Sequence, residues 1–567
     1  MINKLLSINQ RLTGRRFEVF VFLCRLPILG KLFLFLIKQR LGFSALTRFA
    51  EEIDEYPLYY PIPYPVDADE KLKSQKIIVK VPNSIAPLDN TYFSHWTISD
   101  YIEKYKSKTI TPTIVAEKLR GLINELNKRN PILTSFNRDE LMRQAMLSTE
   151  RYRLDKNLEM DGVPLLIKDE IPSLGFPLTF GTSFIQKEVT PSDVPEIIQR
   201  LLNKGFLLIG KANQHELGIG TSGSNVSYGT CRNPYNEEHF TGGSSSGPAA
   251  AVSMGLVPVA IGSDGGGSIR IPASLCGCIG LKATYQRIPI DCNLAPSLVH
   301  VGPFANNVID VAKVYSIMAG RGSNDFQRHS FGQPNPSLPI FDNAFKGLKI
   351  GVFWDHINES DLEIITAIKK ALVFFESRGC SIVDIELPYL KEIHQAHTVT
   401  ILTEMLLMLE PYMRKHMNKF QLESQVSLLI GKTFTAREFL AAQRVRSFAM
   451  KHIEKLFRDE VDIILSPATA ITAPKIEKDS LAVGEYDPIQ TSKLMKFIIH
   501  GNMTGIPAII FPCDYDKKGL PISLQAQAGH WNEDLLLRFA HEGRRLLPRG
   551  MKKPVHYVDV LGNENVK

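Results

Sequence analysis

The chain has 567 residues, of which 44% are hydrophobic and 22% are charged, which is ordinary for a soluble globular enzyme. Its formal net charge of +7 is uneven, because the first 50 residues hold nine Lys or Arg residues and one acidic residue, Glu18. The rest of the chain is therefore nearly neutral, which argues against a broad basic surface for RNA or other nucleic acids.

The cysteines argue against both a disulfide framework and a metal site. They are odd in number and scattered, which favours a reducing compartment: Cys24, Cys231, Cys276, Cys278, Cys292, Cys380 and Cys513. Only Cys276 and Cys278 are close together, and no second pair follows at the spacing of a zinc site. We expect no metal and no cofactor.

Residues 1–55 form a basic arm that contains the apolar stretch FEVFVFLCRLPILGKLFLFLIK (17–38). A membrane-spanning helix is disfavoured, because Arg25 and Lys31 would lie in the hydrocarbon and Pro27 would break the helix. The pattern predicts two short helices lying in a membrane interface, with the basic side chains facing anionic headgroups. The alternative is an arm that packs on the protein's own core or on a dimer partner, and we expect the protein to form a homodimer. No A-x-A cleavage site follows the apolar run, so we expect an intracellular, peripherally membrane-associated protein.

A Pro- and Tyr-rich connector is predicted at 56–94, followed by one large domain at 95–550 and a C-terminal tail at 551–567. The domain opens with two capped helices. Thr97 and Asp100 form a capping box, and Thr111 precedes Pro112 at the first position of a helix with apolar residues at helical spacing.

From residue 162 onward, short buried strands alternate with helices. The predicted strands lie at 162–168, 206–210, 257–262, 348–354, 461–466 and 507–512, and the predicted helices include 193–205 and 361–379. This alternation predicts an α/β fold, a single α/β/α sandwich around a large mixed, twisted sheet with the helical arm at its N-terminus. Residues 389–460 are helical and rich in Leu, Met and His, which indicates core packing or a hydrophobic substrate path.

Two glycine- and serine-rich clusters, TGGSSSGPAAA (241–251) and GSDGGGSIR (262–270), flank an apolar segment. Their small, apolar flanks do not fit a flexible linker. A phosphate-binding loop would need Gly-Lys-Ser/Thr, which is absent from both clusters. The segment DGGGS (264–268), called the glycine loop below, puts three glycines before Ser268, and consecutive backbone amides can converge on developing negative charge.

A nucleophilic serine also needs a base. His239 is the only histidine close to either cluster, but a desolvated lysine can act as the base if burial keeps it neutral. Lys168 ends the apolar run GVPLLIK, where burial would lower its pKa; the alternative is a solvated strand end.

Three separated motifs, DGVPLLIKDE (161–170), TGGSSSGPAAA (241–251) and GSDGGGSIRIPASLCGCIGLKAT (262–284), resemble the amidase signature family. The resemblance runs over about residues 95–550 and implies a Ser-cisSer-Lys triad. Lys168 would be the base, Ser244 the bridging serine in a cis peptide, and Ser268 the nucleophile. The amides of Gly265, Gly266, Gly267 and Ser268 would form the oxyanion hole. Ser245, Asp264 and Arg270 would be supporting residues.

Within this family, the segments HWTISDY, GKANQHELGIGTSGSN and NPYNEEHFTGGSSSG look most like plant-type fatty-acid amide hydrolases. The resemblance implies hydrolysis of N-acylethanolamine-like lipid amides to fatty acid and amine through an acyl-enzyme on Ser268. The arm at 1–50 and the sequence GPAAA after the serines depart from that pattern. The alternatives are an amidase of small soluble amides, the amidase subunit of a tRNA-dependent amidotransferase, or a non-catalytic scaffold.

Overall fold

The computed structural model describes residues 11–62, 93–185, 194–289, 294–322 and 345–562, and the backbone of 187–188. Most of the predicted connector, Cys292 and the last five residues of the tail lie outside these ranges. The described part of the tail packs on the body, where the amide of Val558 donates to the Met254 carbonyl at 2.7 Å.

An eleven-stranded mixed sheet forms the centre of the described structure, in the order β13-β12-β14-β17-β16-β10-β11-β9-β3-β6-β2. Its strands are β2 (Leu133–Phe136), β3 (Pro164–Lys168), β6 (Leu207–Ala212), β9 (Val259–Asp264), β10 (Ile279–Lys282), β11 (His300–Ala305), β12 (Lys349–Val352), β13 (Ser381–Asp384), β14 (Ile463–Pro467), β16 (Ala508–Tyr515) and β17 (Pro521–Ala528). Strand β3 runs parallel to both neighbours, β6 and β9, whereas the pairs from β14 to β9 are antiparallel. The predicted α/β fold with a mixed sheet is confirmed.

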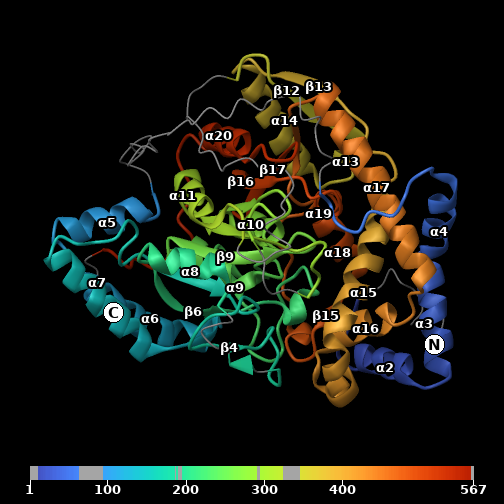
Figure 1. Cartoon of the computed structure of the whole chain (residues 1–567), viewed down its shortest axis with the longest axis horizontal. Helices are drawn as coiled ribbons and strands as arrows, with labels where there is room; N and C mark the ends of the chain where they lie inside the picture. The colour runs from blue at the N-terminus through green and yellow to red at the C-terminus, as the bar shows by residue number, and fades with distance from the viewer. Residues whose placement is uncertain are drawn as a thin grey trace.

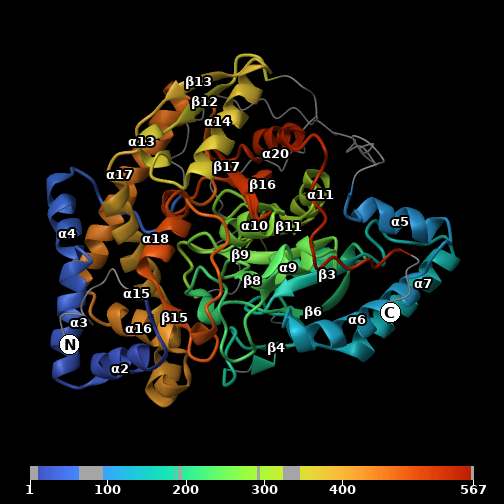
Figure 2. The ribbon, with the colours of Figure 1, turned by 180° about the vertical axis from the view of Figure 1, so that it is seen from behind.

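Helices flank this sheet (Figures 1 and 2). Helix α9 (Ser246–Ser253) packs on β3, β9 and β11, and α10 (Arg270–Cys276) packs on β10, β16 and β17. Helices α11 (Val308–Met318), α14 (Leu362–Glu376) and α20 (Glu533–Gly543) also contact the sheet, and α8 (Glu196–Asn203) packs on α11. Helix α9 lies especially close to the backbone that follows β6, because a Cβ on its Gly247 would stand 2.5 Å from the backbone nitrogen of Asn213.

The two capped helices are as predicted. Helix α5 (Ile98–Lys106) begins with a complete capping box between Thr97 and Asp100. Helix α6 (Pro112–Arg129) begins with Pro112, and the Thr111 side chain accepts from the Ile114 amide. Both lie with α7 (Arg138–Arg153) at the end of the molecule opposite the arm (Figure 1).

The arm folds into α2 (Gly14–Arg25), α3 (Leu29–Arg40) and α4 (Phe43–Glu52). These helices pack along α15 (Leu390–His416), α16 (Leu422–Gly431) and α17 (Ala436–Asp459), at one edge of the molecule in both views (Figures 1 and 2). Helices α2 and α3 are bent by 108° at a break that contains Pro27. Within the described ranges no helix by itself has the length and apolarity to cross a membrane, although α2 and α3 taken together reach both.

The smaller elements complete the body. Three short helices connect larger elements: α13 (Trp354–Ile357), α18 (Pro488–Met495) and α19 (Ile499–Met503). Three short strand pairs lie outside the main sheet: β1 (Leu12–Thr13) with β15 (Glu485–Tyr486), β4 (Pro177–Leu178) with β5 (Lys187–Glu188), and β7 (Arg232–Asn233) with β8 (Asn236–Phe240). The β1–β15 pair joins the start of the described chain to its C-terminal third.

Candidate active site

Lys168 lies at the carboxyl end of β3 and is fully buried. Because β3 and β9 are parallel neighbours, the end of β3 lies beside the residues that lead from β9 into the glycine loop. Burial lowers the pKa of the Lys168 ammonium, and the carboxylate of Glu170, 3.2 Å away, opposes this shift. The strand-end lysine is therefore a desolvated side chain and not a solvated terminus.

Ser244 stands directly against this lysine. The lysine Nζ lies 2.6 Å from the Ser244 Oγ, although the two residues are 76 positions apart in the sequence. The peptide bond between Gly243 and Ser244 is cis. The Ser244 carbonyl accepts from the amide of His215 at 2.9 Å, and the Gly243 amide donates to the Thr221 carbonyl at 2.7 Å. Backbone contacts thus hold this serine on both sides.

Ser268 ends the glycine loop and is 8% exposed. Its carbonyl accepts from the Ser245 amide at 3.2 Å, which ties the two serine-rich segments together, and the Ser245 hydroxyl donates to the Ser263 carbonyl at 3.2 Å. Among the described residues, Ser268 Oγ makes no hydrogen bond. The structure therefore brings the Lys168–Ser244 pair and the Ser268 segment into one site.

The backbone amides of the glycine loop fall into two groups. The amides of Gly265, Gly266 and Ser268 donate to no atom of the described residues. The Gly267 amide differs from our expectation, because it donates to Oδ1 of Asp264 at 2.8 Å. Of the four amides that the sequence predicts as oxyanion donors, the Gly267 amide is thus used within the loop, and the other three have no acceptor among the described residues.

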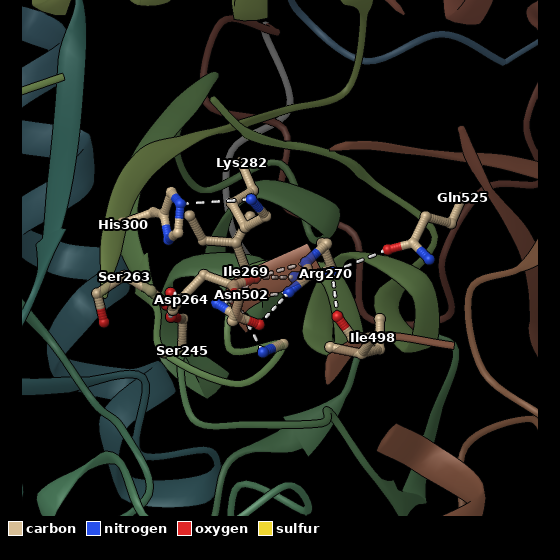
Figure 3. A network of polar contacts seen from close by, with 12 residues as sticks. Ser245, Ser263, Asp264, Ile269, Arg270, Lys282, His300, Ile498, Asn502 and Gln525 are labelled. Carbon is tan, nitrogen blue, oxygen red and sulfur yellow. Dashed lines mark hydrogen bonds and ion pairs between the residues drawn. The ribbon is translucent and has the colours of Figure 1, made fainter. Parts of the chain in front are cut away.

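Asp264 and Arg270 hold the glycine loop from within. The Arg270 Nε and Nη2 donate to the two carboxylate oxygens of Asp264 at 2.9 and 3.0 Å, and both side chains are fully buried. Burial by itself would raise the pKa of Asp264, but the charge of Arg270 outweighs it and holds this pKa below its usual range. Arg270 also donates to the Ile498 carbonyl and to Gln525 Oε1 (Figure 3).

Other residues at the site carried no signal in the sequence. Ser263 Oγ lies 2.8 Å from the lysine Nζ and donates to Glu170. Asn502 reaches the loop from α19, where its Nδ2 donates to the carbonyl and to Oδ1 of Asp264. Lys282 and His300 lie 3.4 Å apart in the same buried network (Figure 3). For a polar residue in a buried strand, a place at the site becomes evident only once its neighbours across the sheet are known.

The comparison with protein families decides the class of this site. The amidase profile matches residues 115–537, which span all three motifs. The chain belongs to the amidase family.

Two curated relatives and one solved structure show that the chain is similar to family members with different named activities. A "Fatty acid amide hydrolase" of Oryza sativa subsp. indica is 37% identical over 97% of this chain and 95% of its own length. One of the subunits of the "Glutamyl-tRNA(Gln) amidotransferase" of Brachyspira hyodysenteriae is 31% identical over 79% of this chain and 98% of its own length. The structure of a 6-aminohexanoate cyclic dimer hydrolase, 25% identical, covers 81% of this chain and 99% of its own with a TM-score of 0.72.

Proposed function

We propose that this amidase hydrolyses fatty-acid amides, such as N-acylethanolamine-like lipids, to a fatty acid and an amine through an acyl-enzyme on Ser268. The observation that carries the proposal is the contact between a fully buried lysine and the serine of the cis peptide, 2.6 Å apart, beside the glycine loop. No metal or cofactor enters the proposed reaction.

The reaction begins with Lys168 in its neutral form, which burial favours. Its Nζ takes the proton of Ser244, Ser244 takes the proton of Ser268, and Ser268 Oγ attacks the amide carbonyl carbon. The amides of Gly265, Gly266 and Ser268 stabilise the resulting oxyanion. The C–N bond breaks as the departing amine receives the proton back through Ser244, and water then hydrolyses the acyl-enzyme.

An apolar cluster beside the glycine loop supports a long acyl chain as part of the substrate. A Cβ on Gly265 would stand 3.0 Å from Val299 Cγ2 and 3.4 Å from Ile401 Cδ1. Both side chains belong to a cluster that continues along α15 and into α16, with Leu217, Leu294, Met405, Leu409, Met413, Phe420 and Leu428 as buried members. Apolar side chains beside the glycine loop suit a hydrocarbon chain better than a small polar amide.

The extent of the similarity also supports the lipid amide. The fatty acid amide hydrolases of Oryza sativa and Arabidopsis thaliana align with 97% of the chain, which must include most of the arm, whereas the glutamyl-tRNA(Gln) amidotransferase subunits of Brachyspira hyodysenteriae and Sulfurihydrogenibium align with 79% of it. A role as such an amidotransferase subunit would leave about a fifth of this chain without a counterpart.

We further propose that the arm docks on a membrane surface. Helices α2 and α3 turn one apolar face into the protein, and the other face exposes Phe22, Ile28, Leu29, Leu32 and Phe35. Exposed basic residues accompany these side chains: Arg15, Arg16, Arg25, Lys31 and Arg40. Apolar side chains with basic neighbours suit a bilayer surface that carries anionic headgroups.

The catalytic assignment is tested with purified enzyme and a series of acyl amides of increasing chain length. We expect Ser268→Ala and Lys168→Ala to lower kcat by about 10³-fold or more while the fold is retained by circular dichroism. Wild-type kcat/KM should rise with acyl length. Full activity of Lys168→Ala near pH 7 contradicts the triad, and a preference for short acyl amides supports the soluble-amide alternative instead.

A further inference from the structure

The direction of each free amide in the glycine loop is set by the carbonyl group of the same peptide unit. In a trans peptide the C=O and N–H bonds point in opposite directions in one plane. A hydrogen-bond donor that binds the carbonyl oxygen from one side therefore makes the amide N–H of the next residue point to the opposite side. Three peptide units of the loop carry the three free amides.

Each of these three carbonyls has a donor. The Asp264 carbonyl accepts from Asn502 Nδ2 at 3.0 Å, and the Gly267 carbonyl accepts from the Ile271 amide at 2.7 Å. The Gly265 carbonyl accepts from His397 Nε2 at 2.7 Å. The Ile271 contact belongs to the start of α10, whereas the donors from Asn502 and His397 come from distant parts of the chain.

The middle peptide is the one that most needs an external donor. It joins Gly265 to Gly266, and glycines tolerate backbone conformations that other residues avoid. With a glycine on both sides, this peptide can turn its carbonyl toward either side at little steric cost. A hydrogen bond from a rigid neighbour is then what selects one orientation.

His397 is well suited to that task. It lies on the long helix α15, is 3% exposed, and packs so closely that a Cβ on Gly266 would stand 3.0 Å from its Cε1. Burial lowers the pKa of His397 to about 4, so the ring is neutral near pH 7. Because a carbonyl oxygen only accepts, the neutral ring carries its proton on Nε2.

We propose that His397 is a positioning residue for amide hydrolysis: its hydrogen bond to the Gly265 carbonyl aims the Gly266 amide into the oxyanion hole. Asn502 holds the neighbouring Gly265 amide in the same way. This inference rests on the proposed amidase reaction, but it assigns a role to a side chain outside the three motifs. His397 does not touch the substrate carbonyl, and it acts through the backbone.

This role predicts a specific kinetic signature. Negative charge on the carbonyl oxygen develops in the transition state, so a misdirected amide lowers kcat and leaves ground-state binding nearly unchanged. His397→Phe keeps an apolar ring and removes the donor. His397→Gln keeps an N–H at nearly the reach of Nε2. His394→Phe, one turn earlier on α15, is the matched control, because His394 Nε2 has no hydrogen-bond partner among the described residues.

The experiment measures kcat and KM for an N-acylethanolamine and the Ki of a fatty-acyl trifluoromethyl ketone, whose adduct with a serine carries an oxyanion. We expect His397→Phe to lower kcat about 10- to 100-fold with KM changed less than about threefold. The ketone Ki should rise in proportion, while the Ki of the product fatty acid stays constant. His397→Gln should recover most of the lost kcat, and His394→Phe should behave like the wild type.

Three outcomes overturn the inference while the amidase function stands. One is an active wild type whose His397→Phe variant keeps its kcat. Another is an equal loss in His394→Phe, which would indicate general packing of α15. The third is a His397→Gln variant as impaired as His397→Phe. A wild type that is inert toward amides and does not bind the ketone overturns the proposed function itself.

Discussion

At the scale of single residues, Lys168 is enclosed by three oxygen groups with different consequences. Ser244 and Ser263 offer neutral hydroxyls at 2.6 and 2.8 Å, and Glu170 offers a carboxylate at 3.2 Å. The hydroxyls tolerate either protonation state of the lysine, whereas the carboxylate favours the charged one. The pKa of this lysine is therefore set by a balance between burial, which lowers it, and the nearby carboxylates, which raise it and among which Glu170 has the largest effect.

The balance predicts the effect of Glu170→Gln on the pH profile. The Glu170 carboxylate raises the pKa of Lys168, so its removal lowers that pKa further. In the proposed reaction the neutral lysine is the active form, so activity should rise as pH increases through this pKa. The rising limb of kcat/KM against pH should therefore move to lower pH in Glu170→Gln. The exposed Glu159, which pairs with Lys204, provides the control Glu159→Gln. An unchanged limb, or one moved to higher pH, contradicts the prediction.

Asp264 gives a prediction for stability. Its pKa is held low in the folded protein, so it stabilises the fold above the ordinary pKa of an aspartate, and that contribution is lost as pH falls toward the lowered value. Asp264→Asn leaves the buried Arg270 charge without its partner. We expect the free energy of unfolding at pH 7 to fall by about 3–5 kcal/mol, measured by denaturant titration. Asp459→Asn, in an exposed pair with Arg458, should cost less than about 1 kcal/mol. Equal losses in both variants would contradict this account.

At the scale of secondary structure, the sequence predicts those strands that consist of an uninterrupted run of apolar residues. The apolar runs that end in Lys168 and begin at 257 correspond to β3 and β9, each fully buried. Strand β17 (PISLQAQA) is as fully buried, yet it is not among the predicted strands, because its two glutamines interrupt the apolar pattern. Their partners supply the reason: Gln525 donates to the Phe497 carbonyl, and Gln527 pairs with His500.

The same limit applies to the site. Family motifs predict Lys168, Ser244 and Ser268, because each sits in a distinctive local pattern. His397 lies in a Leu-, Met- and His-rich helix, a pattern that fits core packing as well as any function. Its contact with Gly265 spans 132 positions and depends on how α15 lies against the sheet. No local pattern encodes such a contact.

The arm helices allow a prediction about their two faces. On α2, Phe20 is buried against the body, whereas Phe22 is 63% exposed. A core Phe→Ala change costs about 3–5 kcal/mol, because it removes contacts and leaves a cavity. We expect Phe20→Ala to speed hydrogen–deuterium exchange across residues 14–40, and Phe22→Ala to leave that exchange as in the wild type. Similar exchange in the two variants would mean that α2 does not pack on the body as described.

At the scale of the whole molecule, the open question is what covers the exposed face of the N-terminal arm. The apolar stretch 17–38 left open whether the arm packs on the protein, on a partner copy or on a membrane. The structure shows packing on the protein through one face, with Val426 and Ile430 of α16 as partners. The other face stays exposed, and the membrane and the predicted homodimer are its two competing occupants.

Vesicle binding distinguishes these occupants. The exposed face is changed by the triple substitution Phe22→Ser, Leu29→Ser and Phe35→Ser, and binding is measured by co-sedimentation with vesicles of phosphatidylcholine and phosphatidylserine. We expect at least about a tenfold loss of binding, because three apolar side chains no longer enter the interface. Activity on a detergent-dispersed amide should be unchanged.

The matched control for this experiment replaces three other exposed apolar residues, Leu362, Val373 and Val555, by serine, and it should bind vesicles like the wild type. Sedimentation velocity of the same proteins reads the oligomeric state. If the arm variant keeps vesicle binding but changes from dimer to monomer, the exposed face is a contact between copies of the chain. If it loses vesicle binding at constant mass, the face belongs to the membrane. Because the substituted side chains point away from the body, neither result should be accompanied by a change in unfolding temperature.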